Sequence, residues 1–253
     1  MTNKQLRNIL QQVAQTTVTD CSLAQKKLAT LPPEIGLLTN LTRLNVSENL
    51  LADLPREIGN LTQLTWLGIY HNQLAALPPA LGKLSNLVDL FAWENRLDSL
   101  PPEIEQLTSL SHLLLAKNKI TSLPPEIGNL TSLTRLNLYS NCLTALHPAV
   151  GNLTQLKDLK LSDNFLTELP PEIGNLNHLQ ELDLSGNQLT HLPPEIGQLT
   201  NLRKLNLWGN QLTEIPPEIG QLTHLTKLRL GGNPITHLPS QLSNLSKLTS
   251  LDV

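Results

Sequence analysis

The side chains that most often carry out chemistry are few and scattered in this sequence of 253 residues. It contains seven histidines and two cysteines. The histidines form no H-x-x-x-H pair or other ligand cluster, so the sequence predicts no metal site. Cys21 stands where a leucine recurs elsewhere, and Cys142 lacks a neighbouring base or cation that would activate its thiol. No glycine-rich phosphate loop is present. We therefore expect no catalytic residue, no metal and no cofactor.

The aromatic residues offer binding chemistry instead. All of them fall outside the positions at which leucine, asparagine, proline and glycine recur, and four belong to two adjacent segments of the chain. Large rings gathered on one surface are typical of protein interfaces, where Trp, Tyr and Arg dominate the binding energy. The sequence therefore predicts a protein-binding patch, which comprises Trp66, Tyr70, Phe91, Trp93, His112, Leu114, Arg43, Arg135 and Tyr139.

A second, more polar zone lies nearer the C-terminus. It follows a group of acidic residues that includes Asp158, Glu181 and Asp183. Mixed charges of this kind most often form a solvated face, so we interpret the zone as secondary to the aromatic patch. Its candidate binding residues are Lys204, Trp208, Lys227 and Arg229.

The elements that must position these residues belong to a repeat of 23 residues. Asparagine recurs at this spacing nine times without interruption, from Asn49 to Asn233. Around each asparagine the pattern is L-x-x-L-x-L-x-x-N-x-L, and the second half of the unit reads L-P-P-E-I-G-N-L-T. Such units cannot bury their apolar face alone, so stacked neighbours must share one continuous core.

Alternation and proline placement predict the structure of each unit. Residues four and six of the first half point inward from a short strand, while residues three, five and seven point outward. Consecutive strands are expected to pair in parallel. All prolines except Pro234 fall in two adjacent columns, such as Pro124 and Pro125. Proline cannot donate to a β-ladder, so these columns predict an extended or 3₁₀ segment beyond the strand. The asparagine is expected to be buried and to satisfy backbone groups of the loops.

The sequence divides into an N-terminal segment, residues 1–17, and a repeat domain, residues 18–253, of about ten units and a truncated last strand. Apolar residues Leu6, Ile9, Leu10 and Val13 lie on one face of a helix, which predicts a cap on the repeat domain. The unfinished last unit predicts that the natural polypeptide continues or that a partner covers this end.

Charge and hydropathy exclude several classes of partner. The net charge is −3, from 18 basic and 21 acidic side chains, whereas a nucleic-acid protein needs a clustered basic surface. No stretch of about 20 apolar residues predicts a membrane span. The N-terminus lacks the continuous apolar core of a secretory signal. We expect a cytoplasmic monomer that binds neither nucleic acid nor membrane.

The unit LTxLxLxxNxLTxLPPEIGNLTx resembles the cytosolic leucine-rich repeats. It is similar to plant intracellular Ras-group repeat proteins, to Ras-pathway scaffolds of animals and to the repeat arms of bacterial Roco GTPases. The resemblance implies an α/β-type solenoid, an arc with a parallel β-sheet on its concave face and short 3₁₀ or extended segments on its convex face. It also implies protein binding through the concave face. Plant receptor ectodomains would show L-x-G-x-I-P here and cysteine-capped ends, so this departure argues against a secreted receptor.

Two functions remain open at this point. The first is a protein-interaction module or scaffold in intracellular signalling, whose partner could be a small GTPase or another signalling protein. The second is the recognition arm of a multidomain enzyme, a Roco-type GTPase or a bacterial ubiquitin ligase, with catalysis elsewhere. The unfinished last unit favours the second. An extracellular adhesion or effector protein would need a secretion signal, which the sequence does not show.

Overall fold

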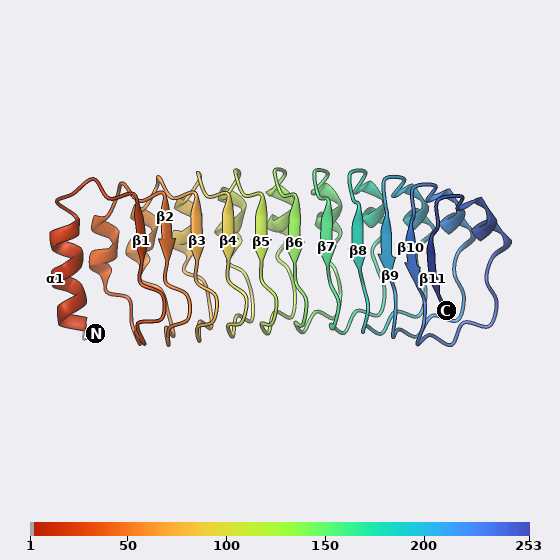
Figure 1. Ribbon diagram of the computed structural model, residues 1–253, viewed down its shortest axis with the longest axis horizontal. Coiled ribbons are helices and arrows are strands. Elements are labelled where there is room, and N and C mark those ends of the chain that lie inside the picture. Colours follow the sequence, from red (N-terminus) through yellow and green to blue (C-terminus); the bar gives the residue numbers. More distant parts are fainter. Residues whose placement is uncertain (1–2) are drawn as a thin grey trace.

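The computed structural model describes residues 3–253 and shows an elongated coil with the termini at opposite ends (Figure 1). A single α-helix, α1 (Asn3–Val13), precedes a regular alternation of short strands and 3₁₀ helices. The strands are β1 (Asp20–Ser22), β2 (Arg43–Asn45), β3 (Trp66–Gly68), β4 (Asp89–Phe91), β5 (His112–Leu114), β6 (Arg135–Asn137), β7 (Asp158–Lys160), β8 (Glu181–Asp183), β9 (Lys204–Asn206), β10 (Lys227–Arg229) and β11 (Ser250–Asp252). The 3₁₀ helices are η1 (Pro33–Leu37), η2 (Arg56–Asn60), η3 (Pro79–Lys83), η4 (Pro102–Gln106), η5 (Pro125–Asn129), η6 (Pro148–Asn152), η7 (Pro171–Asn175), η8 (Pro194–Gln198), η9 (Pro217–Gln221) and η10 (Ser240–Asn244).

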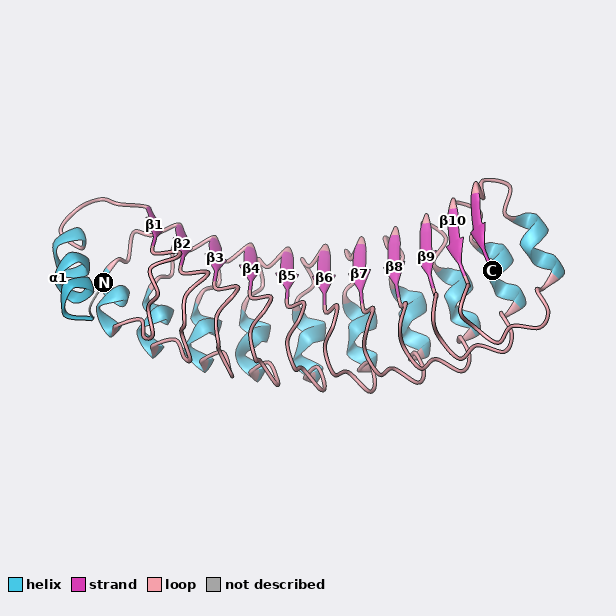
Figure 2. Cartoon of the chain, turned by 60° about the horizontal axis from the view of Figure 1, so that its bottom comes forward, coloured by secondary structure: helices cyan, strands magenta, loops and turns pink. Residues whose placement is uncertain are grey.

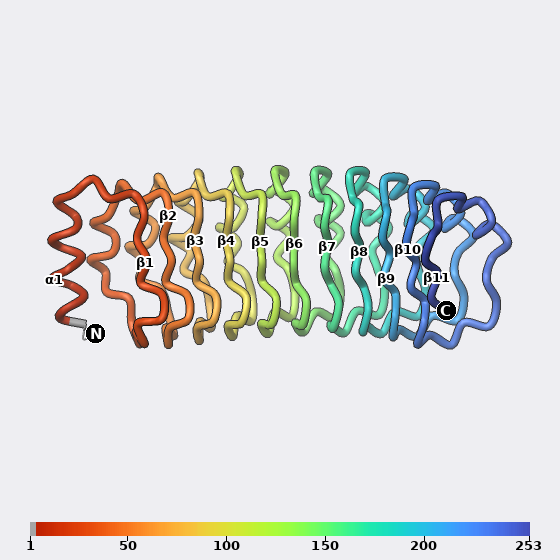
Figure 3. The backbone as a smooth tube through the Cα atoms, viewed as in Figure 1, coloured from red at the N-terminus to blue at the C-terminus, as the bar shows by residue number. Residues whose placement is uncertain are grey.

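The strands form one parallel sheet in sequence order, β1 to β11. Each strand pairs with the next in a register of one repeat, as in His112 opposite Arg135. The chain therefore advances by one turn of the coil per unit (Figure 3). The strands line the inner side of an arc and the 3₁₀ helices its outer side (Figure 2). The predicted solenoid with a concave parallel sheet is confirmed.

The proline columns lie beyond each strand, where the outer turns begin, as predicted. Pro124 is extended, with φ −70° and ψ 151°, and Pro125 opens η5. Where the first proline is replaced by His147, the imidazole Nδ1 accepts a hydrogen bond from the backbone N–H of Ala149 at 3.1 Å. A side chain thus caps the one outer turn that lacks the leading proline, which satisfies one of its free N–H groups.

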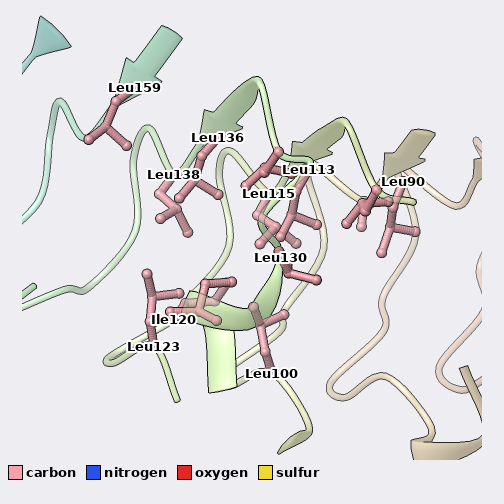
Figure 4. Packing of buried hydrophobic residues seen from close by; sticks show 14 of the residues in the cluster. Leu90, Leu100, Leu113, Leu115, Ile120, Leu123, Leu130, Leu136, Leu138 and Leu159 are labelled. Carbon is pink, nitrogen blue, oxygen red and sulfur yellow. The ribbon is translucent and has the colours of Figure 1, made fainter. Parts of the chain in front are cut away.

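The core is a stack of leucines between the sheet and the outer turns. Within each unit the inward strand residues and the residues of the outer turn meet in the middle of the coil, as Leu113, Leu115 and Leu130 do (Figure 4). These side chains are fully buried and belong to one continuous cluster that extends along the coil. Within residues 3–253 no aromatic side chain is buried. The rings are therefore confined to surfaces, as their positions in the repeat predict.

The asparagine column links each unit to the one before it. Asn141 is buried, and its Nδ2 donates to the carbonyl oxygens of Leu115 and Leu138, both at 3.0 Å. Its Oδ1 accepts from the backbone N–H of Ile120 at 3.0 Å. Leu115 and Ile120 lie in the preceding unit, so one side chain satisfies backbone groups of two turns. The predicted role of this column is confirmed.

Helix α1 packs on the first unit with three of the four residues predicted to face it. Leu6 and Leu10 are fully buried, and Val13 is half-buried against the same core. Ile9, by contrast, is 44% exposed, so its inclusion in the buried stripe is wrong. The helix lies at the N-terminal end of the coil and contacts the first outer turn, η1 (Figure 1). Residues 1 and 2 of the predicted capping segment lie outside the described residues.

A glycine recurs in the outer turns because consecutive turns approach closely there. A Cβ at Gly59 would lie 2.5 Å from the carbonyl oxygen of Ala80 in the next turn, a distance that no real Cβ tolerates. In η4 this position is taken by Glu105 instead. The Glu105 Oε2 accepts a hydrogen bond from Asn129 Nδ2, at 2.8 Å, on the following turn. Among the described outer turns the glycine is absent only from η4 and from η10, where Ser243 takes its place.

Candidate functional site

Strands β3 and β4 bring four rings together on the concave side of the sheet. Trp66 meets Phe91 edge to face, with ring centroids 5.4 Å apart, and Tyr70 stacks on Trp93 at 4.0 Å and an interplanar angle of 7°. Phe91 and Trp93 join the two pairs at 5.5 Å. Offset and edge-to-face contacts of this kind each stabilise by about 0.5–1.5 kcal/mol beyond burial. We call Trp66, Tyr70, Phe91 and Trp93 the aromatic cluster.

The rings of the aromatic cluster cover one another. All four are half-buried, and none lies among the core leucines or on the outer wall. Their arrangement is fixed by ring contacts from both strands, so a partner would meet a preformed surface. A surface that is already ordered loses little side-chain entropy on binding.

A glycine in the strand makes room for Trp66. The indole folds over Gly68, where an added Cβ would lie 2.4 Å from Cη2 and 2.7 Å from Cζ3. On the same ring the Arg43 guanidinium carbon lies 3.7 Å from the centroid, a cation–π contact. Sequence reasoning missed Gly68. The sequence does hold a signal for it. Gly68 is the fifth residue of its unit, and in all the other units the fifth residue has a side chain.

Replacing Gly68 with alanine is expected to displace the Trp66 indole from Arg43 and Phe91. The added methyl occupies the space of the ring, so the near-ultraviolet circular dichroism of the aromatic cluster should weaken. The loss of the cation–π and edge contacts should lower the free energy of unfolding by about 1 kcal/mol.

Ser22→Ala serves as the control for Gly68→Ala, because Ser22 occupies the same strand position in β1. It should leave the near-ultraviolet spectrum unchanged. An unaltered spectrum for Gly68→Ala would contradict the packing of the indole on this glycine.

The structure places some of the remaining predicted patch residues beside the cluster. Leu114 is half-buried and stands opposite Phe91 in the ladder. His112 Nδ1 lies 2.5 Å from Asp89 Oδ1 on the neighbouring strand. These two side chains continue the surface of the cluster onto β5.

Arg135 and Tyr139 lie on β6 or just after it, and their interactions are outside the aromatic cluster. The Arg135 Nε lies 3.1 Å from Asp158 Oδ2, so this arginine points toward the C-terminal half of the sheet. Tyr139 follows β6, two strands beyond Trp93, and has no ring contact with the aromatic cluster among the residues described. Sequence position alone could not show which neighbour each side chain would choose.

A charged row borders the cluster at the turns after the strands, and sequence reasoning places only Glu94 of its members at the rim of the patch. Glu94 lies between His71 Nδ1 at 2.6 Å and Lys117 Nζ at 2.7 Å. The hydrogen bond from Lys117 holds the pKa of the Glu94 carboxyl below its usual range, and the charges of His71 and Lys117 act in the same direction. All three residues have positive φ, near 50–55°. Glycine occupies this position in the last units, as at Gly209, which is the signal that could have revealed it.

The C-terminal zone is open and charged. Lys204 forms an ion pair with Glu181, and a shallow hollow across β7 to β10 is lined by charged side chains of both signs. Burial raises the pKa of the Asp158 carboxyl despite the neighbouring Lys160 and Arg135. Trp208 is 54% exposed. The predicted secondary residues therefore share one surface, separate from the aromatic cluster.

The family models match this chain over most of its length. A model described as a leucine-rich repeat region matches residues 56–149 and 141–206, and a second leucine-rich repeat model matches residues 200–253. The chain belongs to the leucine-rich repeat family. Leucine-rich repeat domains are commonly protein–protein interaction modules. No curated protein matches the sequence.

Solved structures support the same assignment for this leucine-rich repeat chain. A leucine-rich repeat protein of Leptospira interrogans is 42% identical, with a TM-score of 0.89, over 93% of this chain and 60% of that one. A plant peptide hormone receptor in complex with its peptide is 31% identical, with a TM-score of 0.77, over 93% of this chain and 43% of that one. The ectodomain of an Arabidopsis thaliana receptor kinase, in complex with Casparian strip integrity factor 2, is 29% identical, with a TM-score of 0.73. The match covers 94% of this chain and 36% of that one. This chain thus spans less than two thirds of the length of these relatives.

The described residues of this leucine-rich repeat chain offer little for metal binding, for thiol chemistry or for a membrane span. Across residues 3–253 no group of three His, Cys, Asp or Glu side chains is placed to hold a metal ion. Burial raises the pKa of the Cys21 thiol, which disfavours the reactive thiolate. Over the same residues no helix has the length and apolar character required to cross a bilayer.

Proposed function

We propose that this leucine-rich repeat domain is a non-catalytic module that binds a partner protein through the aromatic cluster on its concave face. The observation that carries the proposal is the cluster itself, four contacting rings on a surface where the fold requires none. The core is filled by aliphatic side chains, mostly leucine and isoleucine, so the rings are not needed to fill it. Rigid aromatic side chains beside an arginine are the usual energetic centre of protein interfaces.

The chemistry of the surrounding surface agrees with a protein partner. Charged groups border the rings, among them Glu94, Lys117 and the pair of Asp89 and His112. An apolar centre with a polar rim is the common anatomy of a protein interface. The two plant relatives described above are named as complexes with a peptide or a protein factor. These relatives support a protein or peptide as the partner.

We place the module in the cytoplasm, as a monomeric scaffold in signalling, with a small GTPase or another signalling protein as partner. This part of the proposal rests on the resemblance of the LPPEIG-type unit to intracellular Ras-group proteins. The low net charge and the balanced acidic and basic side chains favour a protein partner over nucleic acid or membrane.

Two phenylalanines provide a matched test. Phe91 lies in the aromatic cluster, whereas Phe165, 48% exposed, lies outside it. Immobilised Phe91→Ala protein should recover the partners of the wild-type domain from cell extract at a level reduced about fivefold, since central aromatic residues dominate interface energy. Phe165→Ala should recover them at the wild-type level. Equal losses for the two variants, or no loss for Phe91→Ala, would rule out the cluster as the contact surface.

A second candidate is the recognition arm of a larger enzyme, a Roco-type GTPase or a bacterial ubiquitin ligase. This candidate rests on the resemblance of the LPPEIG-type unit to the repeat arms of Roco GTPases. The parent gene distinguishes the two candidates: a phosphate-loop or catalytic-cysteine domain beside the repeats would identify the arm.

A further inference from the structure

The concave face carries uncompensated positive charge near its C-terminal end. Lys227 and Arg229 are both exposed, and neither has a carboxylate within 4.0 Å or a side-chain hydrogen bond among residues 3–253. Three other cations of this face are paired: Arg43 Nε lies 3.8 Å from Asp20, Arg135 is bound to Asp158, and Lys204 is bound to Glu181. Lys160 on β7 has no ion pair within the described residues, but it stands alone beside the acidic Asp158. Among the described strands, β10 therefore carries two unpaired cations on one face.

A tryptophan lies at the end of the same row. The Trp208 indole leans from the end of β9 onto the next unit, where a Cβ at Gly231 would be 3.1 Å from Cδ1 and one at Gly232 would be 3.5 Å from Cε2. One side of the ring thus rests on glycine backbone, while the residue as a whole remains 54% exposed. No other tryptophan among the described residues is as open, because Trp66 and Trp93 are covered by other rings. The backbone of these glycines supports one face of the Trp208 indole and leaves the other face open to solvent.

The spacing of these groups matches an extended peptide. Lys227, Arg229 and Gly231 are alternate residues on one side of the chain, so successive groups lie about 6.7 Å apart. Alternate side chains of an extended partner segment have the same spacing. Asp252 stands opposite Arg229 on β11 and is exposed, so it borders the row on one side. On the other side, Lys204 and Asn206 form the near wall of the hollow and leave space for a backbone, while the carboxylates of the hollow lie on the more distant β7 and β8.

We propose that this row, Lys227, Arg229 and Trp208, is a second docking surface, which takes an extended segment of a partner protein with the pattern acidic–x–acidic–x–apolar. The two carboxylates meet Lys227 and Arg229, and the apolar side chain covers the open face of Trp208. Charge complementarity selects an acidic occupant, and the ring gives its third residue a preference for an apolar side chain. The surface uses no residue of the aromatic cluster and goes beyond the function proposed above.

A labelled peptide tests the proposal directly. Fluorescein-labelled Gly-Glu-Ala-Glu-Ala-Leu-Gly, capped at its C-terminus, is titrated with the full chain at low salt and followed by fluorescence anisotropy. It should bind, and the affinity should fall as salt is raised because the cations are exposed. The same peptide with lysine in place of glutamate should not bind. Failure of the acidic peptide to bind at millimolar concentration, or equal binding of the lysine peptide, would overturn the proposal.

Variants locate the binding on the row. Lys227→Gln/Arg229→Gln should weaken binding of the acidic peptide at least about threefold, the range expected for two exposed ion pairs. Trp208→Ala should weaken it further and remove the preference for leucine over glycine at the sixth peptide position. The matched control is Arg56→Gln/Lys83→Gln, which removes the same charge from exposed sites on the outer turns. Equal weakening by this control would show a general charge effect and contradict the assignment.

The aromatic cluster is tested separately in the same assay. Phe91→Ala should bind the acidic peptide as the wild-type chain does. Loss of peptide binding in Lys227→Gln/Arg229→Gln with normal binding in Phe91→Ala supports the second surface whether or not the cluster binds a partner. The reverse result would contradict it.

Discussion

Replacing Asn141 with leucine is expected to lower the free energy of unfolding by about 2 to 4 kcal/mol, the largest stability effect that we predict for a single polar side chain here. The Ile120 N–H is buried and donates to Asn141 Oδ1, so leucine leaves it without a partner. The carbonyl oxygens of Leu115 and Leu138 each lose one donor but keep another, from Asn118 and Asn164. The orphaned N–H therefore contributes most of the loss.

Thermal unfolding followed by circular dichroism measures the effect of Asn141→Leu. For a chain of this size the melting temperature should fall by roughly 5–15 °C. Asn152→Leu is the control, because Asn152 lies exposed in η6 and receives the same substitution. It should change the melting temperature by little. Similar shifts in the two variants would show that the asparagine column does not contribute through its buried hydrogen bonds.

Replacing Trp93 with alanine is expected to weaken partner binding by at least about 2 kcal/mol, or about thirtyfold in Kd, as for a central hot-spot residue. Trp93 is the ring that holds the aromatic cluster together, because it stacks on Tyr70 and also contacts Phe91. Its removal takes away contact surface and the ring contacts that it makes with Tyr70 and Phe91, while Phe91 keeps its contact with Trp66. The free domain should itself lose about 1 kcal/mol of stability through the lost stacking.

The measurement is calorimetric titration with the partner isolated by the wild-type domain, at a temperature where both proteins are folded. Trp93→Phe is the control, since a smaller ring can still stack on Tyr70. It should retain more than half of the binding free energy lost in Trp93→Ala. If both variants bind as the wild-type does, the aromatic cluster is not the contact surface.

The fold could be predicted from the sequence because every framework position has a local physical requirement. The proline at Pro124 must lie outside a ladder, and the buried amide of Asn141 must find backbone partners. A repeat multiplies each of these signals, so the strands, the outer turns and the asparagine links were all predicted. The position of the aromatic residues on the concave side follows from the same alternation.

The detail of the site could not be predicted, because it depends on which neighbour each side chain selects. Alternation places Arg43 and Arg135 alike on the outward face, yet one covers Trp66 and the other binds Asp158. Whether the Trp66 indole packs over Gly68 depends on the rotamer that Trp66 adopts. Such choices are made between strands, and sequence spacing carries no information about them.

Glu105, the exception to the glycines of the outer wall, shows how a stacked array accommodates a change in one unit. Turn η4 packs against η5 as the neighbouring outer turns pack against one another, although Glu105 replaces the glycine there. Its carboxylate lies on the surface between the two turns and accepts a hydrogen bond from Asn129. Because each unit contacts only its neighbours, such a change is absorbed where it occurs. Single units can therefore diverge in sequence while the array keeps its common spacing.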